Sequence, residues 1–296
     1  MRKFAILTDS CSDLSKELRE KFDIDYVKNI IAINGKEFPV SLDWEYFSAK
    51  EYYDMMRKGV KTKSTQVPQK DFYDYFLKCA QEGIDVLYVG CSSALSGSVN
   101  AAKIMKEDIL EEYPNIKIEI VDCLVSSFGE GLQAIKAAEL RAEGKTIEEV
   151  RDYLLENRLK FLQYGSVETL EYLRRAGRVK ATAAFFGNIF SVKPIIISDI
   201  KGQNYAYKKV KGRRASILEI IKQVKENIVN PENQYIGIGH ADCLEDAEFI
   251  KEQLEKEINV KGFYINNINP AVGASVGPGM FAVYFVGKEV TVEANN

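Results

Sequence analysis

The densest group of side chains that could do chemistry lies at residues 91–98, where four serines and one glycine follow a cysteine. The apolar run 84–90 precedes this stretch, and its length and its valine, isoleucine and tyrosine content predict a buried strand. Apolar residues spaced three and four apart after Ser98 predict a helix that ends before Pro114. The first N–H groups of a helix have no partner within it, and the helix dipole makes that end positive. Such a turn can hold a phosphate or a carboxylate, although a structural role for Ser96 or Ser98 as a helix cap explains the pattern equally well.

Three further polar loops lie after other predicted strands or near their ends. They are residues 8–12, 64–66 and 122–127. Strand-like and helix-like stretches alternate through the first half of the chain, which is typical of a parallel sheet with helices on both faces. Ligands of such sheets collect at the carboxyl ends of the strands. We therefore expect these loops to approach the turn at residues 91–98.

The length of 296 residues is typical of two domains. We expect a first α/β domain over residues 1–158 and a second α/β domain over residues 159–296. Three local expectations concern segments near the polar loops: a strand over 26–33, a hydroxyl-rich loop over 62–68, and a glycine-rich turn over 273–279 before a last strand.

The composition is that of an ordinary globular protein, with 46% hydrophobic residues, 28% charged residues and a net charge of -3. This charge gives no general argument for binding nucleic acid or membranes. No stretch approaches the roughly 18 apolar residues of a membrane span, and the apolar run 4–7 is too short for a signal peptide. The five cysteines are scattered without a C-x-x-C pair, which predicts reduced thiols in a cytoplasmic protein and no zinc site.

Several common catalytic patterns are absent from the sequence. Residues 273–279 lack the G-K-[ST] ending of a phosphate-binding loop, and no G-x-G-x-x-G follows a strand, so nucleotide binding is disfavoured. A serine hydrolase needs a base, for which His240 is the sole histidine, and the chain has no G-x-S-x-G elbow. A lipid hydrolase that uses Ser96 with His240 is therefore an alternative function rather than the favoured one.

Two charged groups suggest weaker alternatives. Asp9, Asp13 and Asp122 could form a metal site at the strand ends, but no histidine accompanies them. The basic run 208–214 could meet a phosphate backbone in a nucleic-acid-binding regulator. Only two tyrosines lie near this run as stacking aromatics, so a solvated face is the simpler interpretation.

Six motifs in the right order give the chain a resemblance to the DegV family. They match the family's T-D-S-[ST]-x-D-L opening, its T-S-Q loop, its S-S-x-L-S-G-[ST] turn, its L-x-x-L-x-x-G-G-R-I segment and two short proline-containing motifs. The matching residues here are 8–14, 64–66, 92–98, 170–179, Lys193-Pro194 and Gly277-Pro278-Gly279. The resemblance covers nearly the whole chain. It implies a two-domain α/β fold with a parallel sheet and flanking helices in the first domain and a mixed sheet in the second.

The same resemblance implies a function in lipid binding. DegV-like proteins bind a long-chain fatty acid such as palmitate, and some present it to a fatty-acid kinase that phosphorylates its carboxyl group. The resemblance therefore implies a non-enzymatic role in lipid transport or fatty acid metabolism, with the fatty acid as ligand, no cofactor and a kinase as partner. The ligand would lie between the two domains. Each buried methylene contributes about 0.8 kcal/mol, so the tail could dominate the affinity.

The resemblance also assigns site residues. Ser64 and Ser96 match positions whose hydroxyls hold the carboxylate, and charge-assisted bonds near a helix start suit that group. The residues beside them are Thr65, Ser92, Ser93 and Gly97. Ser275, a shorter neutral side chain, takes the place of a histidine that the family often has. Arg178 matches an arginine needed for contact with the kinase. Residues 181–190 are a candidate lining for the tail, and ordinary core packing explains that apolar segment equally well.

Overall fold

The computed structural model describes residues 4–181 and 192–294, and its first half is built on a four-stranded parallel sheet. The strands are β1 (Phe4–Asp9), β2 (Ile24–Val27), β6 (Asp85–Gly90) and β7 (Ile118–Asp122), in the order β2-β1-β6-β7. All three pairings are parallel, as the alternation of strands and helices predicts. Every residue of β6 is buried, which fits a central strand covered on both faces.

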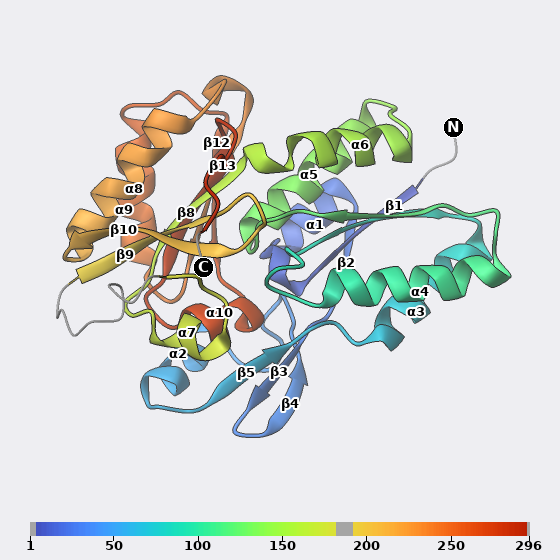
Figure 1. Cartoon of the computed structure of the whole chain (residues 1–296), viewed down its shortest axis with the longest axis horizontal. Helices are drawn as coiled ribbons and strands as arrows, with labels where there is room; N and C mark the ends of the chain where they lie inside the picture. The colour runs from blue at the N-terminus through green and yellow to red at the C-terminus, as the bar shows by residue number, and fades with distance from the viewer. Residues whose placement is uncertain (1–3, 182–191, 295–296) are drawn as a thin grey trace.

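Helices cover both faces of this sheet (Figure 1). Their bounds are α1 (Lys16–Phe22), α3 (Gln69–Glu82), α4 (Ser98–Glu112), α5 (Phe128–Ala142) and α6 (Ile147–Asn157). Along β6, Val86 and Tyr88 pack with α3 and α4, whereas Leu87 and Val89 pack with α1, α5 and α6. This alternation follows from the two-residue period of a strand, and it places the turn after β6 between two helical layers.

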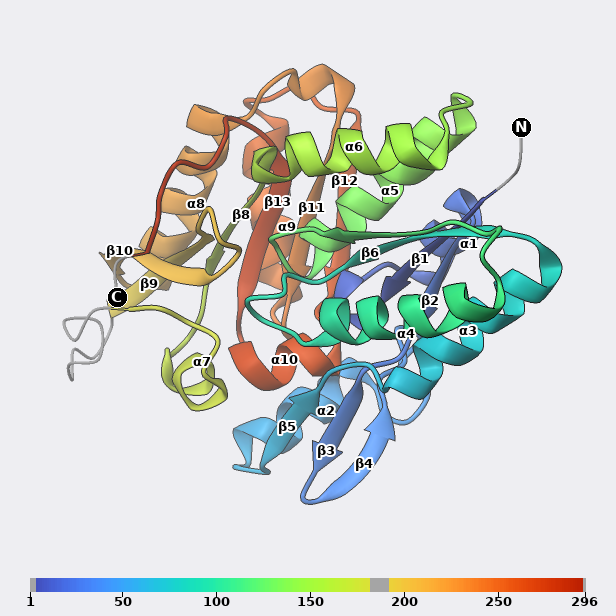
Figure 2. The same ribbon diagram turned by 45° about the vertical axis from the view of Figure 1, so that its right-hand side comes forward.

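A small antiparallel sheet lies beside the parallel one, at the bottom of Figures 1 and 2. Its strands are β3 (Ile30–Ile33), β4 (Lys36–Pro39) and β5 (Thr62–Thr65), in the order β4-β3-β5, and helix α2 (Ala49–Arg57) follows β4 in the chain. Asn34 and Gly35 have φ angles of 49° and 83° in the turn between β3 and β4. Positive φ at both central residues is characteristic of a tight hairpin, and β3 pairs antiparallel with β4.

Two sequence expectations for this region are wrong. The single strand expected over 26–33 is two strands, β2 and β3, which belong to different sheets. The chain changes sheets at Asn29, whose backbone N–H donates to the Ser10 hydroxyl (2.9 Å) and not to a neighbouring strand. The loop expected over 62–68 begins as strand β5, which pairs with β3, because threonines suit a strand as well as a loop.

The second half forms a six-stranded mixed sheet. Its strands are β8 (Phe161–Ser166), β9 (Val192–Ser198), β10 (Asn204–Lys211), β11 (Tyr235–His240), β12 (Gly262–Asn267) and β13 (Phe281–Val286), in the order β10-β9-β8-β13-β11-β12. Strands β11 and β12 pair in parallel, and the other pairs in this sheet are antiparallel. Helices α8 (Arg213–Asn227) and α9 (Leu244–Glu255) cover one face. The mixed α/β fold expected from the sequence is confirmed.

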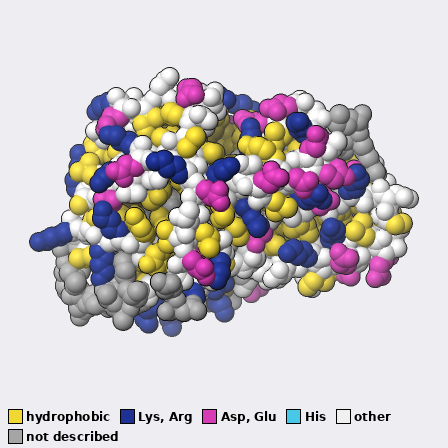
Figure 3. Space-filling model, turned by 45° about the horizontal axis from the view of Figure 1, so that its top comes forward, with side chains coloured by type: hydrophobic (Ala, Val, Ile, Leu, Met, Phe, Trp, Pro, Cys, Tyr) yellow, Lys and Arg dark blue, Asp and Glu magenta, His cyan; other side chains and the backbone are white. Residues whose placement is uncertain are grey.

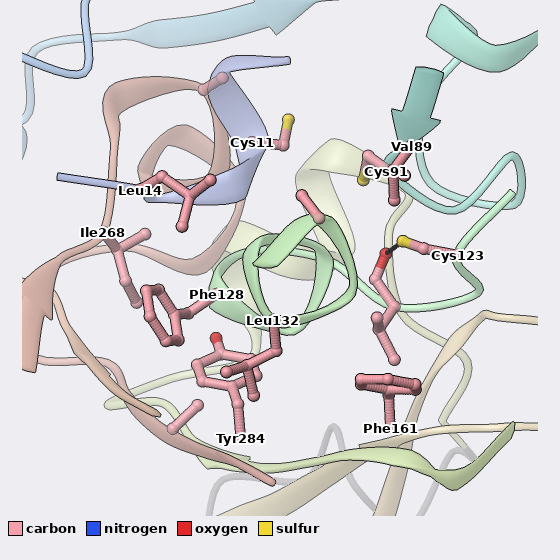
Figure 4. Close-up of a cluster of buried hydrophobic side chains, with 14 of the residues drawn as sticks. Cys11, Leu14, Val89, Cys91, Cys123, Phe128, Leu132, Phe161, Ile268 and Tyr284 are labelled. Atoms are coloured by element: carbon pink, nitrogen blue, oxygen red, sulfur yellow. Dashed lines mark hydrogen bonds between the residues drawn. The ribbon is translucent and has the colours of Figure 1, made fainter. Parts of the chain in front are cut away.

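Helix α5 lies between the two large sheets (Figure 2). It contacts β1 on one side and β8, β11 and β13 on the other. Phe128 and Leu132 of α5 share one apolar cluster with Phe161 and Tyr284 of the second sheet, and Figure 4 shows these side chains together. The core of the molecule therefore joins the two halves of the chain.

The glycine-rich turn expected over 273–279 is wrong in its first half, which is helix α10 (Pro270–Val276). Asn269 starts this helix, because its side-chain oxygen accepts bonds from the N–H groups of Ala271 (2.7 Å) and Val272 (3.2 Å). The proline at the first helical position suits a helix start as well. The turn itself follows the helix and leads into β13.

Two short helices lie near the small sheet. Helix α7 (Glu171–Ala176) packs against α10, and α10 also contacts β3 and β5.

Across residues 4–181 and 192–294, no helix has both the length and the apolar character that a membrane crossing requires.

Candidate functional site

Two serines of the turn between β6 and α4 are hydrogen-bonded within the protein. The Ser92 hydroxyl donates to the Gly202 carbonyl (2.8 Å), and the Ser93 hydroxyl donates to Asp122 Oδ2 (2.5 Å). Ser92 is fully buried, whereas Ser93 is exposed. These two hydroxyls hold the turn in place and are already engaged.

The other two serines of the turn lie at the start of α4. The Ser96 and Ser98 hydroxyl oxygens are 3.0 Å apart, and the Ser96 oxygen accepts from the Ser98 N–H (3.3 Å). The Ser98 oxygen also accepts from the Val67 N–H (3.2 Å), which ties the segment after β5 to the helix start. Ser98 can therefore donate to Ser96 and leave the Ser96 proton for a ligand. Ser96 thus binds the first N–H of α4, and in this arrangement its own proton is available to a ligand.

Strand β5 brings further hydroxyls to the same place. Ser64 and Thr65 pair with β3, and Gln66 follows them. The Gln66 side chain lies over Gly97, because a Cβ added at Gly97 would stand 1.9 Å from Gln66 Oε1. A glycine at this position therefore lets the loop after β5 close against the start of α4.

These segments enclose a cavity of about 320 Å³, whose wall is drawn from both halves of the chain. Of the residues that the sequence assigns to the site, the wall contains Ser64, Thr65, Ser96, Gly97, Arg178 and Ser275. Ser92 and Ser93 are not part of the wall. The structure thus brings together residues that are more than 200 positions apart in the sequence.

The described wall of the cavity carries two cations and no acidic side chain. One is Lys63 of β5, and the other is Arg178, which follows the left-handed turn at Gly177 (φ 68°) after α7. The Arg178 guanidinium donates from Nε to the Leu95 carbonyl (3.0 Å) and from Nη1 to the Ala176 carbonyl (2.5 Å). Hydroxyls and cations without a carboxylate favour an anionic ligand.

Three amide side chains of the wall were missed by the site prediction. They are Asn29, Gln66 and Asn204. Asn29 is 2% exposed, and its Oδ1 accepts from the Cys11 thiol (3.7 Å). Asn204 accepts from Gln163 (2.8 Å) and donates to the Arg178 carbonyl (3.0 Å). Two signals in the sequence could have indicated such positions: Asn29 is a polar residue inside an apolar run, and Gln66 ends the motif at 64–66.

The cavity continues into a narrower recess of about 30 Å³. Both spaces share Ser126, Leu173, Asn204, Val272 and Val276. Beyond these residues the recess is lined mainly by apolar groups of β8, β9 and β13, among them Ile196 and Ala282. A polar chamber beside an apolar recess suits an amphipathic ligand, but the recess has room for only about one water-sized group. The candidate tail lining at 181–190 lies outside the described residues except for Ala181, which packs against the core.

The chain matches, over residues 3–288, the family model described as "Uncharacterised protein, DegV family". The chain belongs to the DegV family. It is 37% identical to a DegV domain-containing protein of Clostridium perfringens over 97% of this chain and 98% of that one. A DegV domain-containing protein of Streptococcus pyogenes serotype M1 is 30% identical over 96% of this chain and 98% of its own length.

Solved DegV structures have the same fold. A DegV lipid-binding protein of Thermotoga maritima superposes with a TM-score of 0.85 at 28% identity, over 98% of this chain and 100% of that one. A second Thermotoga maritima protein, reported to reveal a fatty acid binding function, gives 0.85 at 26% identity, over 97% and 100%. A DegV family protein of Thermus thermophilus, described for its fatty acid binding, gives 0.86 at 25% identity, over 97% and 100%.

In this DegV protein His240 does not line the cavity that contains Ser96. It ends β11, is 4% exposed, and its Nδ1 accepts from the Cys243 N–H (3.4 Å). Burial lowers the pKa of His240. Within the described residues no contact joins His240 to Ser96, so the hydrolase alternative gains no support from the structure.

The three aspartates considered for a metal site each bond to different partners. Asp9 Oδ2 accepts from the Tyr88 hydroxyl (2.7 Å), Asp13 accepts from Asn269 (2.7 Å), and Asp122 accepts from Ser93. Throughout residues 4–181 and 192–294, no three histidine, cysteine or acidic side chains gather in a way that could hold a metal ion. The aspartates therefore serve as hydrogen-bond acceptors of the DegV fold.

The basic run at 208–214 is neutralised in part by acidic neighbours. Lys208 pairs with Glu219 (2.9 Å), and Arg213 pairs with Asp246 (2.6 Å) and Glu168 (2.5 Å). On the face drawn in Figure 3, basic and acidic side chains are interspersed. This pattern supports a solvated face, as a nucleic-acid site would present a continuous basic surface.

Proposed function

We propose that this DegV protein binds a long-chain fatty acid such as palmitate, with its carboxylate at Ser64 and Ser96 and its tail in apolar space between the two halves of the chain. The observation that carries the proposal is that two spaces adjoin each other. One is a chamber lined with hydroxyls and cations, and the other is a small recess with mainly apolar walls. The lipid and fatty acid binding reported for the solved relatives supports the same function.

The head group would be held by donors from both halves. Ser64 and Ser96 donate to the carboxylate, with Thr65 and Ser275 as neighbouring hydroxyls and Gly97 as the position that lets the chain approach closely. Lys63 adds positive potential, which favours the ionised acid over a neutral lipid. Ser92 and Ser93 act indirectly in this proposal, since their hydroxyls shape the turn.

The two halves, residues 1–158 and 159–296, would act as the two domains that flank the ligand. We also propose that the protein is not an enzyme and needs no cofactor, and that it carries a fatty acid in lipid transport or fatty acid metabolism. The five cysteines are free thiols, which fits a reducing compartment such as the cytoplasm.

Mass spectrometry of the purified protein tests the fatty acid directly. The protein is denatured, extracted with organic solvent, and the extract is compared with that of an unrelated protein purified in parallel. A fatty acid of about 16 to 18 carbons in the first extract only supports the proposal. An ester-cleaving activity that requires His240, with no fatty acid bound, would replace it with the hydrolase.

The kinase partner is tested with Arg178→Ala. We expect this variant to keep its bound lipid and to lose phosphorylation of that lipid by a fatty-acid kinase. Arg174→Ala is a matched control, because Arg174 is an exposed arginine of α7 that pairs with Glu171 (2.9 Å) and does not line the cavity. If Arg178→Ala purifies without lipid, the arginine belongs to the binding site and the docking role is wrong.

A further inference from the structure

Asp13 connects three segments that are far apart in the sequence. It follows the 3-10 turn Ser10–Ser12, has a φ of 53° and is 3% exposed. Its Oδ1 accepts from both the backbone N–H and the side-chain amide of Asn269 (2.7 Å each), and its Oδ2 accepts from the Ser127 hydroxyl. The Asp13 carbonyl accepts from the Asn266 amide (2.9 Å). One residue of the first half thus fixes the segment that leads into α10.

Helix α10 is the element that this contact places. Asn269 is bonded to Asp13 on one side and caps α10 on the other. The helix has seven residues, so its position depends on how its start is held. It supplies Ala271, Val272, Ser275 and Val276 to the wall of the cavity. A change at Asp13 therefore reaches the ligand site through Asn269.

The groups that face Asp13 are neutral. Besides Ser127 and Asn269 they include Tyr53 of α2, whose hydroxyl donates to the Ile268 carbonyl (2.7 Å), and Tyr284 of β13. Burial raises the pKa of both tyrosines, so both stay protonated. Figure 4 shows the apolar side chains around this junction, with Leu14, Phe128 and Ile268 on the side of Tyr284.

No cation among the described residues compensates the Asp13 carboxylate. Burial raises the pKa of Asp13 to about 7, and the hydrogen bonds from Ser127 and Asn269 lower it part of the way. The carboxyl group therefore changes its ionisation near neutral pH.

We propose that Asp13 is a positioning residue of the ligand site, which holds α10 and Ser275 against the cavity through Asn269 and thereby couples ligand affinity to a proton. The inference rests on the proposed function and adds a regulation to it. Bonds from N–H groups to an ionised carboxylate are roughly twice as strong as bonds to a neutral acceptor. When Asp13 is protonated, the Ser127 hydroxyl can rotate to accept, but the bonds to Asn269 weaken. The site is therefore better formed when Asp13 is ionised.

Equilibrium binding of radiolabelled palmitic acid at pH 6 and pH 8 tests this coupling. We expect the wild-type protein to bind about threefold to tenfold more tightly at pH 8. Asp13→Asn keeps the shape of the side chain without its titration, so its affinity is equal at the two pH values. Glu130→Gln is the matched control, because Glu130 is a buried acid outside the cavity wall, and it keeps the wild-type profile. Burial lowers the pKa of His240, and this residue does not line the cavity.

A second variant covers the case in which Asp13→Asn does not fold. In Ser127→Ala the ionised carboxylate loses one donor, so the midpoint of the pH profile moves to higher pH. An unchanged midpoint in Ser127→Ala, or a wild-type profile in Asp13→Asn, overturns the inference. A wild-type protein that binds palmitic acid equally at both pH values overturns the inference alone, whereas one that binds none at either pH overturns the proposed function as well.

Discussion

The cavity wall and the buried acidic cluster behind it are two polar regions at the ends of the same parallel strands. The buried acidic cluster is defined by Thr8, Asp9, Tyr88 and Glu130, none of which is measurably exposed. Its members bond to one another: Asp9 accepts from Tyr88 (2.7 Å), and one Glu130 oxygen accepts from Thr8 (2.5 Å). The described wall is also polar, with hydroxyls, amides and cations but no acids, and Ser64, Ser96 and their neighbours border open space.

This difference shows that residue type alone does not mark a binding site. Burial raises the pKa of both Asp9 and Glu130. Both Asp9 oxygens and Oε1 of Glu130 accept hydrogen bonds from neighbours, whereas Oε2 of Glu130 is buried without a partner. Two serines of one turn differ in the same way. The Ser92 hydroxyl donates to a carbonyl within the protein, whereas Ser96 borders the cavity. What separates the two regions is whether the polar groups border open space that a ligand could occupy.

The largest effect on fatty acid affinity is expected when the Ser64 and Ser96 hydroxyls of the wall are removed together. If Ser64 and Ser96 each donate to a carboxylate, each bond contributes roughly 1.5–3 kcal/mol. Ser64→Ala with Ser96→Ala should then weaken fatty acid binding by at least about tenfold and leave the fold intact. The preference for chain length should not change, because the tail keeps its apolar surroundings. Isothermal titration with acids of several lengths measures both quantities.

A fatty alcohol of equal length is the control for this double variant. It has the same tail and no charge, so its affinity should fall much less than that of the acid. If acid and alcohol lose affinity by the same factor, the two serines do not recognise a carboxylate, and their role is that of turn and cap.

Local sequence signals predict much of the fold, because they depend on neighbours in the chain. The capping boxes at Ser48 and Thr146 start α2 and α6, and the alternation of strand-like and helix-like stretches predicts the parallel sheet. The candidate site is less predictable. Strand β5 needs β3 as its partner, and α10 is started by an asparagine that Asp13 holds from 256 positions away. No local pattern contains these contacts.

A smaller effect is expected from Tyr88→Phe in the buried acidic cluster. The change leaves Asp9 Oδ2 without its donor in a buried place, which should lower the free energy of unfolding by about 1–3 kcal/mol at pH 8. Fatty acid binding should stay the same, since Tyr88 does not line the cavity. Urea unfolding together with titration of the ligand separates the two quantities.

The pH dependence of this variant gives a second test. Burial raises the pKa of Asp9 above its unfolded value of 3.8, and the Tyr88 bond lowers it in part. The contribution of Asp9 to stability therefore falls as pH rises from 3.8 through the folded value. Loss of the Tyr88 hydroxyl raises the folded pKa further, so the loss of stability should be greater at pH 8 than at pH 5. An equal loss at both pH values would mean that Asp9 does not change its ionisation between them.

The smallest effects on stability and affinity are expected for Ser92 and Ser93, which lie in the same turn as Ser96. Ser92→Ala removes a hydroxyl that lies four residues before Ser96. That hydroxyl donates to the buried Gly202 carbonyl (2.8 Å). Its loss should cost about 1 kcal/mol of stability, the usual net value of one hydrogen bond. Because Ser92 does not border the cavity, acid and alcohol should lose affinity by the same small factor. Ser93→Ala, at an exposed position, should cost less stability still. A loss of affinity for the acid but not for the alcohol in Ser92→Ala would show that this serine binds the carboxylate. Ser92 would then belong to the ligand site and not to the protein interior.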